Sequence, residues 1–142
     1  MIHYICKSYQ EIQENLWFEV ILKDYSLCAA SISEINGFLY QFKFFAANDG
    51  CFVVVDREEY MQTLAEFGLP QGEAKRMIMS LTEKNYVKGP EEDRDKPGAN
   101  IWVFGIDLNG DQLYIKLSDA FKHNVAKCIS FHKAKSRIKY PY

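Results

Sequence analysis

The stretch that decides the fold runs from Asn100 to Lys133 and reads NIWVFGIDLNGDQLYIKLSDAFKHNVAKCISFHK. It contains three runs in which apolar and polar residues alternate, as they do in strands that are buried on one face. The first two runs meet at Asn109-Gly110, a dipeptide typical of two-residue hairpin turns. A short polar link precedes the third run. These features predict a three-stranded antiparallel meander.

The side-chain period of two predicts that this meander has one apolar and one polar face. The second run, Leu113–Leu117, sends its three aliphatic residues to one side and leaves Tyr114 and Lys116 on the other. Alignment of the apolar faces then fixes which polar residues become neighbours, because a strand that slips by one residue turns its apolar side outward.

The third run, Lys127–Lys133, follows the same alternation. The pattern predicts Ile129 and Phe131 on the apolar side, and Cys128, Ser130 and His132 on the polar side. Tyr114, Lys116, Ser130 and His132 would therefore share one surface, which is the candidate functional site.

Composition places the chain among globular proteins. Its 142 residues are 48% hydrophobic and 25% charged, a mixture that supports one packed core without metal or disulfide staples. Its four cysteines form no C-x-x-C pair, so neither a zinc knuckle nor a redox motif is predicted. They are Cys6, Cys28, Cys51 and Cys128.

The sequence predicts a cytoplasmic protein with reduced thiols and no membrane segment. The apolar patch Leu16–Leu22 is too short and too interrupted to cross a bilayer. The first residues also lack the basic flank and continuous apolar region of a signal peptide.

Positive charge is concentrated at the C-terminal end, although the net charge is only -2. The segment from Phe121 to the end has no Asp or Glu. Its cations are Lys122, Lys127, Lys133, Lys135, Arg137 and Lys139. Such a block suits a polyanion such as RNA. A solvated tail, or a patch that meets an acidic protein, would give the same pattern.

The region before the meander predicts helices around one short strand. Residues 1–30 are interpreted as an extension, with a short helix at Ser8–Asn15 and a strand at Trp17–Leu22, and residues 31–142 as the main domain. A capping box at Ser31 and Glu34 opens a predicted helix that reaches Ala46. Its aromatic residues also alternate as they would in a strand.

The next elements carry clear boundary signals. Valines in Cys51–Val55 predict a short buried strand, and Asp56 and Gly68 are suitable ends for a helix. Pro70 is expected to open another helix. An acidic loop, Gly89–Asn100, then separates this helix from the meander. Together the pattern predicts an α+β fold in which a small antiparallel sheet packs against two to three helices.

Carboxylates in two places could hold a metal, but neither spacing supports one. Glu91, Glu92 and Asp93 are adjacent in a loop and are more typical of solvated acids. Asp107–Asp111 resembles part of a calcium loop without its closing Glu. We expect no metal and no cofactor.

The order of these elements resembles the MqsR family of RelE-like toxins, which are bacterial mRNA interferases of toxin-antitoxin systems. The resemblance spans about Ser31–Lys133. It is carried by TLAEFGLPQGEAKRMIMSLTEKNYVK at Thr63–Lys88, by Ile101-Trp102, by LYIKL at Leu113–Leu117 and by CISFH at Cys128–His132.

The resemblance implies a RelE-like fold, cleavage of RNA without a metal, and inhibition by a cognate antitoxin protein. The functional positions of the family fall on Lys88, Tyr114 and His132. At a fourth position this chain has Val103 where a better-known member has glutamine.

The chemistry of these side chains agrees with that implication. Metal-free RNA cleavage needs a base for the 2′-hydroxyl, an acid for the 5′-oxygen and cations around the phosphorus. Histidine is the side chain that changes charge near neutral pH. The predicted catalytic residues are His132, Tyr114 and Lys88, and the predicted RNA- or phosphate-binding residues are Lys116, Lys133, Arg137 and Ser130.

Two other functions remain open from the sequence. One is a non-catalytic RelE-like binding module whose basic end contacts nucleic acid or an acidic protein. The other is an immunity or regulatory protein that binds its partner through the acidic segment Glu91–Asp95.

Overall fold

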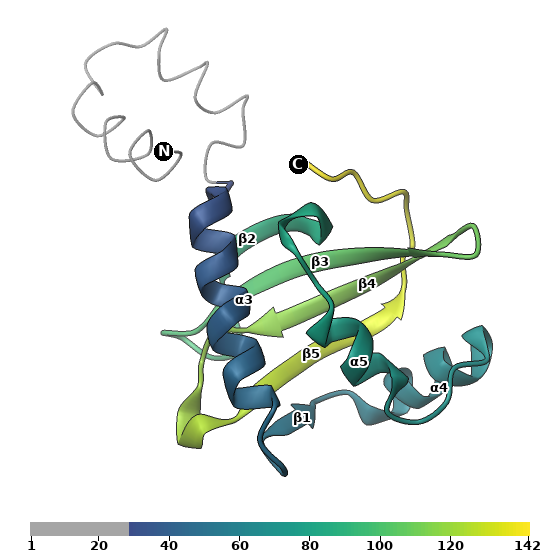
Figure 1. Ribbon diagram of the computed structural model, residues 1–142, viewed down its shortest axis with the longest axis horizontal. Helices are drawn as coiled ribbons and strands as arrows, with labels where there is room; N and C mark the ends of the chain where they lie inside the picture. The colour runs from purple at the N-terminus through teal and green to yellow at the C-terminus, as the bar shows by residue number, and fades with distance from the viewer. Residues whose placement is uncertain (1–28) are drawn as a thin grey trace, which may run out of the picture.

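The computed structural model describes residues 29–142 (Figure 1). They form an α+β fold with three α-helices and a five-stranded sheet in the strand order β1-β5-β4-β3-β2. The helix predicted at Ser8–Asn15, the strand predicted at Trp17–Leu22 and nearly all of the predicted extension 1–30 lie outside the described residues. Within residues 29–142, none of the helices has the length and apolar character that crossing a membrane requires.

Helix α3, Ile32–Ala46, begins at the predicted capping box. The Glu34 N–H donates to Ser31 Oγ and the Ser31 N–H donates to Glu34 Oε1, both at 3.1 Å. The aromatic run is therefore helical, because its buried residues recur every three to four positions. These buried residues are Ile35, Phe38, Leu39, Phe42 and Ala46. Phe38 stacks on Trp102 with ring centroids 4.6 Å apart and so joins the helix to the sheet.

Strand β1, Phe52–Val54, and helix α4, Arg57–Phe67, follow the predicted boundaries. The prediction that this strand is buried is wrong in part, because β1 lies at the edge of the sheet and only Val54 of its valines is buried, whereas Val53 is exposed. Asp56 accepts a hydrogen bond from the Glu59 N–H, and Gly68 ends the helix at φ 66°, where glycine avoids steric strain.

Helix α5, Glu73–Met79, begins three residues later than Pro70, where it was expected. The Glu73 N–H donates to the Pro70 carbonyl across a turn, and Gly72 at φ 90° is left-handed. The helix can only start after this turn.

The predicted meander is confirmed. It consists of β3, Asn100–Leu108, β4, Asp111–Ser118, and β5, Ala126–Lys133, and β4 pairs with both β3 and β5 in antiparallel fashion. At the hairpin, Asn109 and Gly110 have φ values of 53° and 85°, as a type I′ turn requires at both positions.

The sheet is larger than the predicted meander and is mixed. Strand β1 joins its edge in parallel with β5, with Val53 opposite Lys127. At the other edge, β2, Tyr86–Glu92, pairs with β3 in antiparallel fashion. The predicted loop Gly89–Asn100 is therefore wrong in its first part, since the chain is a strand as far as Glu92.

Gly89-Pro90 is typical of a turn, so the sequence did not predict strand β2. Two features of the strand accommodate this pair of residues. Proline is tolerated because β2 is an edge strand of the sheet that residues 29–142 form. Gly89 lies so close to β3 that an added Cβ would be 2.6 Å from the Ile101 carbonyl oxygen. The pairing shifts register on both sides of Lys88, which breaks the regular alternation.

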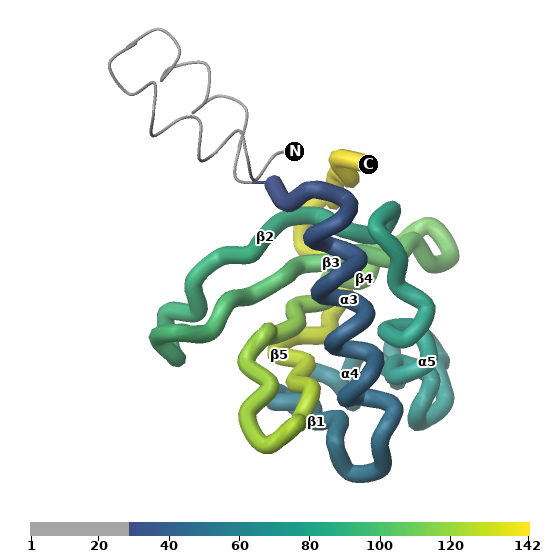
Figure 2. The backbone as a smooth tube through the Cα atoms, turned by 60° about the vertical axis from the view of Figure 1, so that its left-hand side comes forward, coloured from purple at the N-terminus to yellow at the C-terminus, as the bar shows by residue number. Residues whose placement is uncertain are grey.

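All three helices lie on one face of the sheet (Figures 1 and 2). The core lies between them and is lined from the sheet by residues on alternate positions of the central strands. These are Trp102, Phe104, Leu113, Ile115, Leu117, Cys128 and Phe131.

Two residues of the third run depart from the prediction: Cys128 faces the core, and Ile129, predicted on the apolar side, is not part of the core. Cys128 pairs with Leu117 and is fully buried in the core, whereas Ser130 pairs with Lys116 on the other face. The register shift between these pairs makes Ile129 the extra residue of a β-bulge. A bulge reverses the alternation on one side of itself, so strict period-two reasoning assigns Cys128 to the wrong face.

Candidate functional site

The candidate site lies on the outer face of the sheet, meaning the face that points away from the helices. Cross-strand partners place its residues in rows, because directly opposed residues project to the same side. One row consists of Gly105, Tyr114 and His132, and the next consists of Lys88, Val103, Lys116 and Ser130. The structure therefore brings together five predicted site residues: Lys88, Tyr114, Lys116, Ser130 and His132.

Tyr114 and His132 form a stacked pair on adjacent strands. Their ring centroids are 5.0 Å apart and their planes differ by 19°. His132 Nδ1 lies 2.8 Å from the Lys133 carbonyl oxygen. Because a carbonyl oxygen only accepts, Nδ1 carries the hydrogen, and Nε2 holds the lone pair in the neutral ring. The histidine is thus oriented with one nitrogen available as a base.

The neighbouring row places two lysines on either side of an apolar residue. Val103 pairs with Lys88 on one side and Lys116 on the other, and it is only 1% exposed. Lys88 Nζ lies 3.5 Å from Glu91 Oε1. Among residues 29–142, Lys116 has no carboxylate partner, so its charge is available to an anion.

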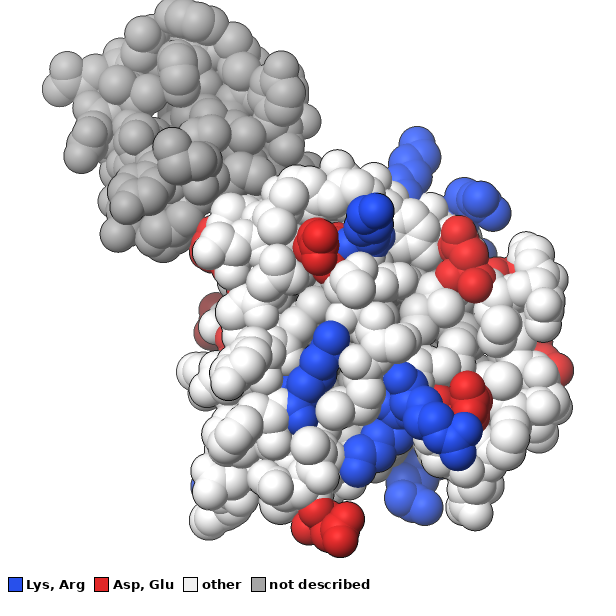
Figure 3. Space-filling model, viewed as in Figure 1, with Lys and Arg blue, Asp and Glu red and all other residues white. Residues whose placement is uncertain are grey.

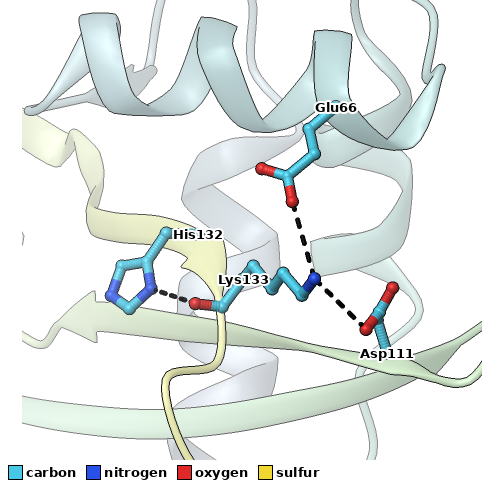
Figure 4. Close-up of polar contacts among 4 residues, drawn as sticks. All are labelled: Glu66, Asp111, His132 and Lys133. Carbon is cyan, nitrogen blue, oxygen red and sulfur yellow. Dashed lines mark hydrogen bonds and ion pairs between the residues drawn. The ribbon is translucent and has the colours of Figure 1, made fainter.

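Lys133 lies apart from the other predicted phosphate-binding residues. It pairs with Leu113, a core residue, and its ammonium lies 3.7 Å from Glu66 and 3.4 Å from Asp111. Figure 4 shows its side chain directed toward helix α4, away from the His132 ring. Two carboxylates already neutralise this charge, so Lys133 connects α4 to the sheet.

Residues 134–142, the C-terminal tail, cross the outer face beside the Tyr114 row. The Ile138 N–H donates to Gln112 Oε1 at 2.7 Å, and the Tyr140 hydroxyl donates to Asp107 Oδ1 at 2.9 Å. Gly105 leaves room for this crossing, since a Cβ there would be 2.8 Å from the Tyr140 oxygen. The tail then reaches the start of α3, where the Tyr142 hydroxyl donates to the Ala30 carbonyl at 2.7 Å (Figure 1).

The hydrogen bond from Tyr140 in the tail to Asp107 shifts the pKa of both residues. Hydrogen bonds from Gln112 and Tyr140 hold the pKa of Asp107 below its ordinary value. Burial, followed by the hydrogen bond to Asp107, raises the pKa of Tyr140 to about 12. Arg137 is exposed beside this pair and lies close enough to act on both pKa values, so it belongs to the tail and not to the lysine row.

The contributions of Asp107, Gln112 and Tyr140 were missed by sequence reasoning. Asp107 was interpreted only as part of a turn, and no local signal relates it to a tyrosine 33 residues later. The basic character of the tail was visible, whereas its path depends on the small size of Gly105.

Cys128 takes no part in the chemistry of the outer face. Burial raises the pKa of its thiol to about 12, so it stays protonated at neutral pH and is a poor nucleophile. Within the described residues, no cluster of three or more His, Cys, Asp or Glu is arranged to hold a metal ion.

On the helix-covered side, Lys and Arg side chains lie beside Asp and Glu side chains in several places (Figure 3). Arg76, for example, is 2.8 Å from Glu73.

No family model, no curated protein and no solved structure matches this chain.

Proposed function

We propose that this protein is a metal-independent endoribonuclease of the RelE-like, MqsR-like toxin type, neutralised by a cognate antitoxin. The observation that carries the proposal is the stacked Tyr114–His132 pair next to Lys116, whose ammonium has no carboxylate partner within residues 29–142. An oriented imidazole, a phenol and a cation on one exposed surface are the groups that RNA transesterification needs.

In the proposed reaction, His132 Nε2 accepts the proton of a ribose 2′-hydroxyl. The 2′-oxygen attacks the adjacent phosphorus, the bond from phosphorus to the 5′-oxygen breaks, and the products carry a 2′,3′-cyclic phosphate and a 5′-hydroxyl. Lys116 and Lys88 stabilise the negative charge on the phosphorus oxygens. The hydroxyl group of Tyr114, which lies in the same row as His132, donates a proton to the departing 5′-oxygen.

A specific observation favours a second candidate, a non-catalytic RNA-binding module. Val103 occupies the centre of the lysine row, where the resemblance would place glutamine, and it is buried. A valine offers no hydrogen bond to a phosphate or base. The lysines and the aromatic pair would still bind single-stranded RNA in that case.

Cleavage of RNA by the purified full chain in the presence of a chelator separates the two candidates. We expect the wild-type protein to produce fragments with 2′,3′-cyclic phosphate ends, and His132→Ala to lose this activity by roughly 10²- to 10⁴-fold, the usual contribution of general acid-base catalysis.

His123→Ala is the matched control, because His123 is exposed in the link between β4 and β5 and lies outside the two rows. It should cleave like the wild type. Absence of cleavage by the wild type, together with tight RNA binding, would support the binding module. Equal cleavage by wild type and His132→Ala would exclude the proposed mechanism. The antitoxin partner is tested by expressing this protein alone, which should arrest growth, and then together with the product of the neighbouring gene, which should restore growth.

A further inference from the structure

Asp107 lies on the outer face, one row beyond the stacked Tyr114–His132 pair. Its two chain neighbours pack against the core, so its own side chain projects to the opposite side. Asp107 pairs with Gln112 on β4, and the next outer-face pair along these strands is Gly105 with Tyr114. Two strand residues span about 7 Å, so the two rows are about 7 Å apart. A nucleotide bound at His132 can therefore reach Asp107.

Two hydrogen bonds fix the Asp107 carboxylate through one of its oxygens. Gln112 Nε2 donates to Asp107 Oδ1 at 2.8 Å, and the Tyr140 hydroxyl donates to the same oxygen at 2.9 Å. Gln112 is buried and is itself held by the Ile138 N–H, which donates to Gln112 Oε1 at 2.7 Å. The carboxylate is therefore oriented before any ligand binds, which lowers the entropy lost on binding.

The second oxygen of this carboxylate is left for a ligand. Within residues 29–142, no hydrogen bond or salt bridge uses Asp107 Oδ2, and the side chain is exposed. The hydrogen bonds from Gln112 and Tyr140 hold the pKa of this carboxyl below its ordinary value, so it is ionised at neutral pH. An ionised carboxylate only accepts hydrogen bonds. The ligand group that fits Oδ2 is therefore an N–H or O–H donor and not a phosphate.

The tail places a third aromatic ring beside the stacked pair. A Cβ on Gly105 would lie 2.8 Å from the Tyr140 oxygen and 3.1 Å from Tyr140 Cε1, so the phenol covers Gly105, the direct partner of Tyr114. Tyr140 over β3, Tyr114 on β4 and His132 on β5 therefore follow one another across the sheet. Proteins bind single-stranded RNA by stacking its bases on aromatic side chains and holding its phosphates with cations. This row thus suits a base, and the lysine row beside it suits phosphate.

From these contacts we infer that Asp107 is a specificity-determining residue, which accepts a hydrogen bond from the amino group of an RNA base lying against the aromatic rings. The inference rests on the proposed function and adds which bases the site takes. Adenine, cytosine and guanine each carry an exocyclic amino group on the Watson–Crick edge. Uracil carries none, and its N–H lies between carbonyl oxygens that repel a carboxylate. The site therefore disfavours uracil beside the bond that is cleaved.

The test is the affinity of the full wild-type chain for three fluorescein-labelled oligomers of eight 2′-deoxynucleotides, whose bases are all adenine, all cytosine or all uracil. These oligomers lack the 2′-hydroxyl nucleophile, so they are bound without being cleaved. Fluorescence anisotropy gives Kd for each. We expect the adenine and cytosine oligomers to bind about tenfold more tightly than the uracil oligomer, as one hydrogen bond to a charged group allows.

Asp107→Asn is the sharpest variant because it exchanges one oxygen for an NH₂ group. The amide oxygen can still accept from Gln112 and Tyr140, while the amide nitrogen takes the place of Oδ2 and donates to a carbonyl oxygen instead. The preference against uracil should disappear or reverse. Tyr140→Phe keeps the carboxylate and removes one of the bonds that orient it, so the preference should fall by less. Near-UV circular dichroism checks that both variants are folded.

Asp49→Asn is the matched control, because Asp49 is exposed in the turn between α3 and β1 and its substitution changes the net charge equally. It should keep the wild-type preference. Equal loss of preference in Asp49→Asn and Asp107→Asn would overturn the inference, because it would report net charge alone.

Equal affinity of the wild type for all three oligomers, or an unchanged preference in Asp107→Asn, would also overturn the inference while leaving the proposed cleavage intact. Failure of the wild type to bind any oligomer would refute the proposed function together with the inference. Base-selective binding that depends on Asp107, in a chain that cleaves no RNA, would support the base site and favour the non-catalytic RNA-binding module.

Discussion

The two faces of the sheet differ although the same strands build them. On the core face, the central strands contribute apolar side chains that three helices cover, and the largest of these are fully buried. On the outer face, the same strands carry Lys116, Tyr114 and His132, which a ligand can reach. Because successive side chains of a strand point to opposite faces, alternate residues of one strand pack in the core and the residues between them face outward, where a ligand can contact them. Adjacent residues should therefore give opposite phenotypes.

Leu117→Ala should give the largest effect on stability, because Leu117 is fully buried beneath the helices. Truncation of a buried leucine removes its transfer free energy and leaves a cavity, at a cost of about 2–5 kcal/mol in the free energy of unfolding. Urea denaturation measures the change. Correctly folded Leu117→Ala protein should still cleave RNA, whereas full stability of this variant would contradict the assignment of Leu117 to the core.

Lys116→Ala changes the adjacent residue on the other face. We expect a decrease in kcat/KM of roughly 10²-fold, similar to the loss of one group that stabilises charge in a transition state. The free energy of unfolding should change by less than about 0.5 kcal/mol, as for other surface substitutions. Single-turnover cleavage and urea denaturation of the same preparation check both expectations. A loss of stability without a loss of activity would refute the division between the two faces.

The core face was largely predictable from the sequence because its signals are local. The capping box at Ser31, the turn at Asn109-Gly110 and the alternation in Leu113–Leu117 each reside in a few consecutive residues, and each was confirmed. Local signals describe an element without reference to the rest of the chain.

The outer face was less predictable because it depends on irregularities and distant contacts. The bulge at Ile129 decides where Cys128 and Ser130 point, and strand β2 forms in spite of Gly89-Pro90. The alternating pattern contains no sign of an extra residue. The contact of Tyr140 with Asp107 joins positions 33 residues apart, so only the folded chain brings them together.

Gly105→Ala sharpens the comparison by adding one methyl group to the outer face. The new Cβ would be 2.8 Å from the Tyr140 oxygen and 3.0 Å from Ile138 Cδ1, so both side chains must shift and the hydrogen bond from Tyr140 to Asp107 is disturbed. We expect a cost of about 1–3 kcal/mol and faster trypsin cleavage after Lys135, Arg137 and Lys139. Mass spectrometry of the timed digest identifies the sites.

Gly37→Ala on α3 is the matched control, since its Cβ would have no atom within 4 Å. Alanine favours a helix over glycine, so this variant should gain about 0.5–1 kcal/mol and keep the tail resistant to trypsin. Identical digestion of both variants would show that Gly105 does not hold the tail in place.

The smallest expected effect is a change in pH dependence at Tyr140. Its pKa is raised from 10.0 to about 12, so the folded chain keeps the phenol proton at pH values where the unfolded chain has lost it. The resulting stabilisation is complete below about pH 10 and is lost as the pH rises toward 12. Tyr140→Phe should remove this component, so its stability should fall less steeply than that of the wild type between pH 10 and 12.

Denaturant unfolding across this range measures the difference, and Tyr40→Phe, at a ring that is 76% exposed on α3, should follow the wild-type curve. Parallel curves for Tyr140→Phe and wild type would mean that the folded chain does not shield the Tyr140 phenol from solvent.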